Sequence, residues 1–163
     1  MSVNLTPSST RELDDRLDRL IGWYGDGTDG LSPTRAQWQH ALDRPADAAF
    51  ILVNFFRMKA EAEYQPEALA ALDNASPGTG QDAFDRYAAV SMPAMARAGG
   101  SFLFAGPGMG AFLGPDEDWD LVVIGRYPGP DALWALFSDP AYRAAYHHRT
   151  AALERQTVMM ASE

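Results

Sequence analysis

Residues 50–56 read FILVNFF, a run of large apolar side chains interrupted once, by Asn54. A short run rich in β-branched and aromatic residues is typical of a strand in the interior of a sheet. Apolar and polar residues do not alternate along it, as they would in a strand with one face in water. We therefore expect a strand whose sheet is covered on both faces. The polar residue in mid-strand should need a hydrogen-bond partner or a ligand.

Three further segments have the composition of strands: 101–106 (SFLFAG), 119–127 (WDLVVIGRY) and 157–161 (TVMMA). Apolar residues recur at helical spacing over 83–98 and over 130–154. In the second of these helices, Asp139 and Pro140 predict a break and a restart. The order βαββαβ is that of an α+β, ferredoxin-like fold, and its two crossover helices can cover only one face of the sheet.

Two amphipathic helices precede the first strand, and their apolar stripe is formed by Leu13, Leu17, Leu20 and Trp38. Ser32 is expected to cap the second of them. We expect residues 1–46 to form a two-helix extension and residues 47–163 to form the ferredoxin-like domain. Either the extension or a second copy of the chain should cover the free face of the sheet. Burial of each large apolar side chain contributes roughly 1.5–3 kcal/mol, which favours a homodimer.

The composition excludes several classes of partner and chemistry. The chain of 163 residues has a formal net charge of −9, which argues against nucleic acid and membrane surfaces as partners. It contains no cysteine, which rules out disulfides and thiolate ligands and fits a cytoplasmic protein. GDGTDG, residues 25–30, has the letters of a dinucleotide-binding loop but joins two predicted helices. Such a loop must join a strand to a helix, so we expect no cofactor.

Several stretches resemble a bacterial family, domain of unknown function 1330, over roughly residues 48–161. They are VNFFRM at 53–58, AFDRYAAVSMPAMARAGG at 83–100 and the long segment from Trp119 to Glu154. Within the last segment, the Trp119–Asp120 pair and the run from Asp139 to Tyr142 followed by Arg149 are the most telling pieces. The resemblance implies a dimeric α+β barrel, in which two ferredoxin-like sheets pack face to face, and implies no particular reaction.

Six residues are candidates for binding a small organic ligand: Asn54, Tyr87, Trp119, Arg126, Tyr142 and His147. Asn54 and His147 are also the candidate catalytic residues, because an amide in mid-strand and an imidazole can both act on a substrate. Each candidate has a structural alternative, such as a satisfied core group or a solvated side chain. His147 and His148 are adjacent and point about 100° apart on a helix, so they do not form a metal pair, and we expect no metal.

Two functions remain open from the sequence. The first is a dimer that binds or transforms a small organic molecule between sheet and helices. In fold plan it resembles the cofactor-independent antibiotic-biosynthesis monooxygenases and the haem-degrading enzymes, some of which use an Asn, a Trp and a His. The second is a non-catalytic structural or regulatory dimer whose N-terminal helices contact another protein. Whether the protein is an enzyme is not decided by these residues.

Overall fold

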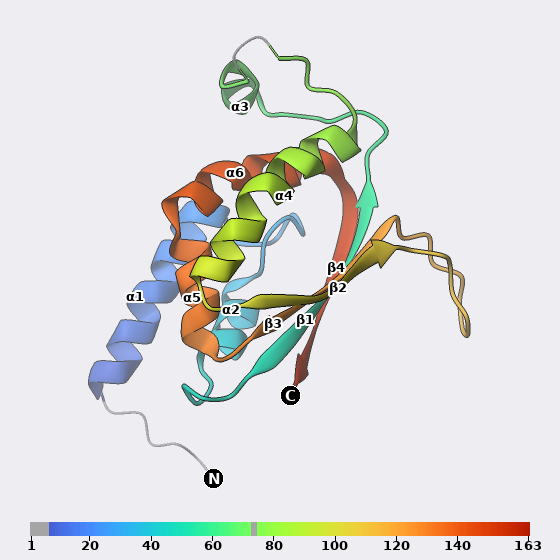
Figure 1. The fold of residues 1–163 in the computed structure, drawn as a ribbon. Coiled ribbons are helices and arrows are strands. Elements are labelled where there is room, and N and C mark those ends of the chain that lie inside the picture. The colour runs from blue at the N-terminus through green and yellow to red at the C-terminus, as the bar shows by residue number, and fades with distance from the viewer. Residues whose placement is uncertain (1–6, 73–74) are drawn as a thin grey trace.

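The computed structural model describes residues 7–72 and 75–163, and its centre is one antiparallel sheet of four strands (Figure 1). The strands are β1 (Phe50–Met58), β2 (Ser101–Pro107), β3 (Leu121–Tyr127) and β4 (Leu153–Ser162). Their order across the sheet is β2-β3-β1-β4, with the predicted strand β1 in the interior. The α+β class is confirmed, and the strand order is compatible with the predicted ferredoxin-like arrangement.

Helix α4 (Gly80–Arg97) connects β1 to β2, and helices α5 (Pro130–Ser138) and α6 (Pro140–Ala152) connect β3 to β4. A short helix, α3 (Pro66–Ala70), lies in the connection before α4. The predicted break is confirmed, because Asp139 ends α5 and caps α6. Its carboxylate accepts hydrogen bonds from the backbone N–H groups of Ala141 at 2.8 Å and Tyr142 at 3.1 Å.

The N-terminal helices are α1 (Pro7–Tyr24) and α2 (Arg35–Leu42). Helix α2 begins later than predicted, because Thr34 rather than Ser32 is its cap. The Thr34 hydroxyl accepts a hydrogen bond from the N–H of Gln37, and the Gln37 side chain accepts one from the N–H of Thr34. This reciprocal capping box satisfies two N–H groups, and Ser32 remains in the loop before the helix.

The N-terminal helices lie on the same side of the sheet as the crossover helices (Figure 1). Tyr24 donates a hydrogen bond of 2.7 Å to the carbonyl of Phe137, and Trp23 stacks on Trp134 with ring centroids 5.9 Å apart. The side chains of Leu17, Leu20 and Trp38 are buried in the same core as β1 and α4. The apolar stripe is therefore covered within the chain. The division into residues 1–46 and 47–163 stays a prediction about folding units.

The two faces of the sheet differ in what covers them. Phe50, Leu52, Asn54 and Phe56 alternate toward the helices, whereas the opposite side chains form what we call the outer face. The outer face consists of the half-buried Ile51, Val53, Phe55, Val122 and Ile124, with the exposed Phe104 and Met159 at its edges. None of the described helices crosses this face (Figure 1). The prediction that the N-terminal helices could cover it is therefore wrong.

A long connection between β2 and β3 projects beyond the sheet (Figure 1). Three of its apolar side chains, Met109, Phe112 and Leu113, are 96%, 105% and 92% exposed. Together with the outer face, they form a large apolar surface that the described residues do not cover. Along the described ranges 7–72 and 75–163, no helix is both long and apolar enough to cross a membrane.

Candidate functional site

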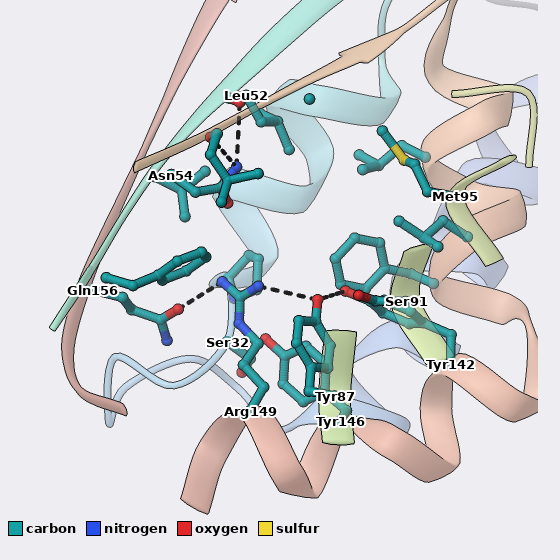
Figure 2. A pocket seen from close by; sticks show the side chains of 18 of the residues that line it. Ser32, Leu52, Asn54, Tyr87, Ser91, Met95, Tyr142, Tyr146, Arg149 and Gln156 are labelled. Carbon is teal, nitrogen blue, oxygen red and sulfur yellow. Dashed lines mark hydrogen bonds between the residues drawn. The ribbon is translucent and has the colours of Figure 1, made fainter. Parts of the chain in front are cut away.

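A pocket of about 1010 Å³ lies between the helix-facing side of the sheet and the helices (Figure 2). Its walls come from all four strands, from α4, α5 and α6, and from α2 with the loop before it. The volume lies at the upper end of the range typical of small-molecule sites. Most of the lining side chains are apolar, among them Leu52, Phe84, Met95, Phe102 and Leu133. The N-terminal extension is thus part of the pocket wall.

Asn54 faces this pocket from the middle of β1 (Figure 2). Its amide nitrogen donates hydrogen bonds to the carbonyl oxygens of Leu52 at 3.2 Å and Val123 at 3.1 Å. Since both partners are acceptors, these bonds fix which end of the amide is nitrogen. The amide oxygen of Asn54 is then the atom that can accept a hydrogen bond from a ligand.

Two tyrosines and an arginine form a connected group on the helix side of the pocket (Figure 2). The hydroxyls of Tyr87 on α4 and Tyr142 on α6 share a hydrogen bond of 2.8 Å. Arg149 on α6 donates to the Tyr87 hydroxyl at 3.2 Å and to the side-chain oxygen of Gln156 on β4 at 2.7 Å. These bonds hold the guanidinium between the helices and the sheet.

Arg149 is buried, with 8% of its surface exposed, and no described carboxylate forms an ion pair with it. Burial lowers its pKa, but the oxygens of Tyr87, Tyr146 and Tyr142 raise it, and the resulting pKa lies above the ordinary value. Burial also raises the pKa values of Tyr142 and Tyr146, so these hydroxyls are neutral and supply no counter-charge. The guanidinium is therefore a buried cation among neutral groups.

Aromatic rings offset part of the cost of burying this charge. The Arg149 guanidinium carbon lies 4.7 Å from the ring centroid of Phe56, 5.6 Å from that of Tyr87 and 5.7 Å from that of Tyr146. A cation–π contact contributes about 0.5–2 kcal/mol. Removing a charge from water costs several kcal/mol even after relaxation. The aromatic contacts and two neutral hydrogen bonds therefore compensate Arg149 incompletely.

Three buried polar atoms of pocket-lining residues have no hydrogen-bond partner among the described residues: Ser32 Oγ, Trp38 Nε1 and Arg149 Nε. Buried polar groups are nearly always paired in folded proteins, so each such atom calls for an explanation. These three atoms are themselves buried within the wall, so they do not face the open space of the pocket.

Of the six candidates named from the sequence, the pocket brings together Asn54, Tyr87 and Tyr142. Trp119 lies at the outer face instead, where its ring centroid is 5.8 Å from that of Phe55. Arg126 also belongs to the outer face, and it forms an ion pair with Glu163 near the C-terminus. His147 is not part of the pocket wall. The Asn, Trp and His set of the monooxygenase resemblance is therefore not gathered at one place.

His147 and His148 lie at the far side of α6, next to the connection between β1 and α4. Their rings are 4.0 Å apart, and the ring of Tyr64 lies 6.0 Å from His147. Arg86 Nη1 donates to the Tyr64 hydroxyl at 3.1 Å, and this hydroxyl shares a hydrogen bond of 2.8 Å with His148 Nδ1. These contacts fasten the connection to α6.

Sequence reasoning missed Arg149, Tyr146 and Gln156 as pocket residues. A signal was present, because Tyr142, Tyr146 and Arg149 are spaced by four and three residues and share one helix face. Within residues 7–72 and 75–163, no group of three His, Asp or Glu side chains could hold a metal ion.

The chain is similar to a known family and to two solved structures. A family model described as a domain of unknown function, DUF1330, matches residues 77–162. A crystal structure of RPA0582, a protein of unknown function from Rhodopseudomonas palustris, is similar with 28% sequence identity and a TM-score of 0.69, over 82% of this chain and 95% of that chain. A structure of methylated RPA0582 gives the same identity and TM-score over 82% and 93%. Among curated proteins, none matches.

Proposed function

The chain belongs to the DUF1330 family, a family of unknown function, and we propose that it binds a small, largely apolar organic molecule in the pocket between its sheet and its helices. The observation that supports this most directly is the pocket of about 1010 Å³, whose mostly apolar wall carries a few polar groups at defined positions. That combination is typical of small-molecule sites, where apolar surface provides affinity and a few polar groups fix orientation.

The polar groups stand on opposite walls. Asn54 presents its amide oxygen from the sheet, and Tyr87 and Tyr142 present their hydroxyls from the helices. A ligand with a hydroxyl or N–H donor facing β1 would satisfy the Asn54 oxygen, whereas its apolar part would contact Leu52 and Phe84. The proposal is one of binding and includes no reaction.

Binding can be tested with N-phenyl-1-naphthylamine, a neutral apolar dye whose fluorescence rises when it leaves water. Ala88 and Ala89 are neighbours on α4, and Ala88 lines the pocket whereas Ala89 is exposed. Ala88→Trp fills the pocket and should weaken dye binding at least about tenfold, since the dye competes with the indole for apolar space. Ala89→Trp adds the same side chain outside and should change the affinity less than about twofold. Absence of saturable binding to the wild type, or equal binding by both variants, would refute the proposal.

We also propose that the protein is a homodimer, with the outer face of one copy packed against that of a second. The outer face and the exposed Met109, Phe112 and Leu113 form an apolar surface that residues 7–72 and 75–163 leave open. Apolar surface of this extent is unusual on a monomer and marks an interaction site. A second copy presents the same surface, so a twofold axis makes the two faces complementary without any other partner. A chain without cysteine suits the reducing cytoplasm, where we place this dimer.

We propose that a groove of about 300 Å³ beside the outer face binds the connection between β2 and β3 of the partner. It is lined by Phe55, Phe104, Trp119 and Val122, together with residues at the base of the connection itself. In the proposed dimer, the exposed Phe112 of each copy lies against this groove of the other.

A further inference from the structure

We infer that the ligand of the pocket is an organic carboxylate with a single negative charge and an apolar body, and that its carboxylate binds to Arg149. The inference rests on the proposed function and names the chemical class of the ligand. Arg149 reaches the pocket from α6, between Gln156 and Tyr87, and only 8% of it is exposed (Figure 2).

The Arg149 guanidinium has more N–H groups than its two hydrogen bonds to Tyr87 and Gln156 use. Two of its N–H groups are used by Tyr87 and Gln156, and the N–H of Nε has no acceptor among the described residues. A guanidinium carries five N–H groups in a rigid fork that matches the two oxygens of a carboxylate. Both of its present acceptors are neutral, and the aromatic faces around it offset only part of the lost hydration. A ligand carboxylate would supply the missing counter-charge and accept from the terminal nitrogens Nη1 and Nη2, each of which has a second N–H group.

The charge of the ligand is limited by the rest of the pocket. Among the described residues that line it, Arg149 is the one lysine or arginine, and Asp85 adds a negative charge to the wall. The whole chain has a formal net charge of −9. A second anionic group would therefore meet no fixed cation and an unfavourable field, which disfavours phosphate monoesters and dicarboxylates relative to a single carboxylate.

The surroundings of Arg149 hold it in place for this contact. The Tyr87 hydroxyl and the Gln156 oxygen fix the guanidinium from two sides, and the Gln156 amide nitrogen donates to the Gly30 carbonyl at 3.3 Å. The Tyr146 hydroxyl donates to the Leu31 carbonyl at 3.0 Å, which ties the same loop to α6. Ser32, whose hydroxyl has no partner among the described residues, lies in this loop and lines the pocket. The apolar body of the ligand would extend toward Leu52 and Met95.

The experiment compares two ligands that differ in charge at one group, 1-naphthaleneacetate and 1-naphthaleneacetamide, by titration calorimetry. The wild type should bind the carboxylate at least about tenfold more tightly than the amide, as expected for a charge-assisted hydrogen bond in a buried site. Arg149→Met removes the charge and keeps much of the volume. It should reduce the ratio of carboxylate to amide affinity to about one. Arg149→Lys keeps the charge without the fork and should retain part of the preference.

The outcomes separate this inference from the proposed function. If the amide and N-phenyl-1-naphthylamine bind the wild type and Ala88→Trp blocks both, whereas the carboxylate binds no more tightly than the amide, the inference is overturned and the proposed function stands. If neither naphthalene compound nor the dye binds, both are overturned. The wild-type comparison decides the inference even if Arg149→Met does not fold, which thermal melting of each variant would show.

Discussion

His148 and Arg149 are neighbours in the sequence, but successive residues of a helix point about 100° apart, and the two side chains have different surroundings. Arg149 lies in the pocket among Tyr87, Tyr146 and Gln156. His148 lies against Tyr64, whose hydroxyl is 2.8 Å from its Nδ1. One ring therefore fastens a connection to α6, and the adjacent guanidinium faces the proposed ligand.

His148 predicts a dependence of stability on pH. Burial, together with the nearby His147 and Arg86, lowers the pKa of His148 from 6.5 to about 4. Between these two values the unfolded chain binds a proton at this residue and the folded chain does not, so the free energy of unfolding should fall as the pH falls from 6.5 toward 4. Urea unfolding at pH 7, 5.5 and 4.5 measures this. His148→Gln should weaken the dependence, because the amide does not titrate, and an unchanged slope would contradict the prediction.

At the scale of elements, the break between α5 and α6 is fixed by one side chain. The Asp139 carboxylate accepts from the N–H groups of Ala141 and Tyr142 and forms an ion pair of 2.9 Å with Arg97 of α4. The Arg97 hydrogen bond and the two backbone hydrogen bonds lower the pKa of Asp139, although burial opposes them. This cap starts α6 so that Tyr142, Tyr146 and Arg149 follow on the face that lines the pocket.

Substitution of Asp139 should separate its two roles. Asp139→Ala removes the cap and should lower the free energy of unfolding by about 1–2 kcal/mol. Asp139→Asn keeps an acceptor for the helix N–H groups and loses the ion pair with Arg97, whose side chain is 55% exposed. An ion pair of this kind contributes about 0–1 kcal/mol, so the asparagine variant should lose less. Equal losses in both variants, measured by urea unfolding, would mean that the cap contributes nothing.

For the whole molecule, the critical question is what covers the outer face. Ile124 lies in the centre of that face on β3, whereas Ala89 is exposed on α4. In sedimentation velocity, the wild type should sediment with twice the chain mass of 17.8 kDa. Ile124→Glu should produce a monomer, because a buried unpaired charge is costly in an apolar interface. Ala89→Glu adds the same charge elsewhere and should leave the dimer intact.

A second variant tests the dimer independently, in case Ile124→Glu does not fold. Phe112→Ser changes a side chain that is fully exposed in the single chain. It should weaken the dimer without affecting the fold, as circular dichroism would show. A wild type that stays monomeric at its highest soluble concentration would refute the proposed dimer.

The amino-acid sequence alone determined the order of the strands and the longer helices, because alternation, helical spacing, caps and breaks are properties of neighbouring residues, whereas the short helix α3 was not predicted. FILVNFF predicted the interior strand β1, and Asp139 with Pro140 predicted the restart of α6. The sequence did not predict where the N-terminal helices pack, because their apolar stripe fits any apolar surface of suitable shape. By residue type, Ser32 and Thr34 were equally suitable N-caps of α2. The reciprocal hydrogen bonds between Thr34 and Gln37 decided in favour of Thr34.

The site depended on tertiary structure. Asn54 pairs with Val123 across β1 and β3, and this register puts the odd-numbered residues of β3 toward the pocket and Arg126 away from it. A shift of one residue would have reversed both, and no local pattern fixes that choice. Arg149 likewise became a candidate only when folding buried it beside Tyr87 without a carboxylate. Burial and the absence of a counter-charge arise from residues far apart in the chain, so the folded structure alone decides them.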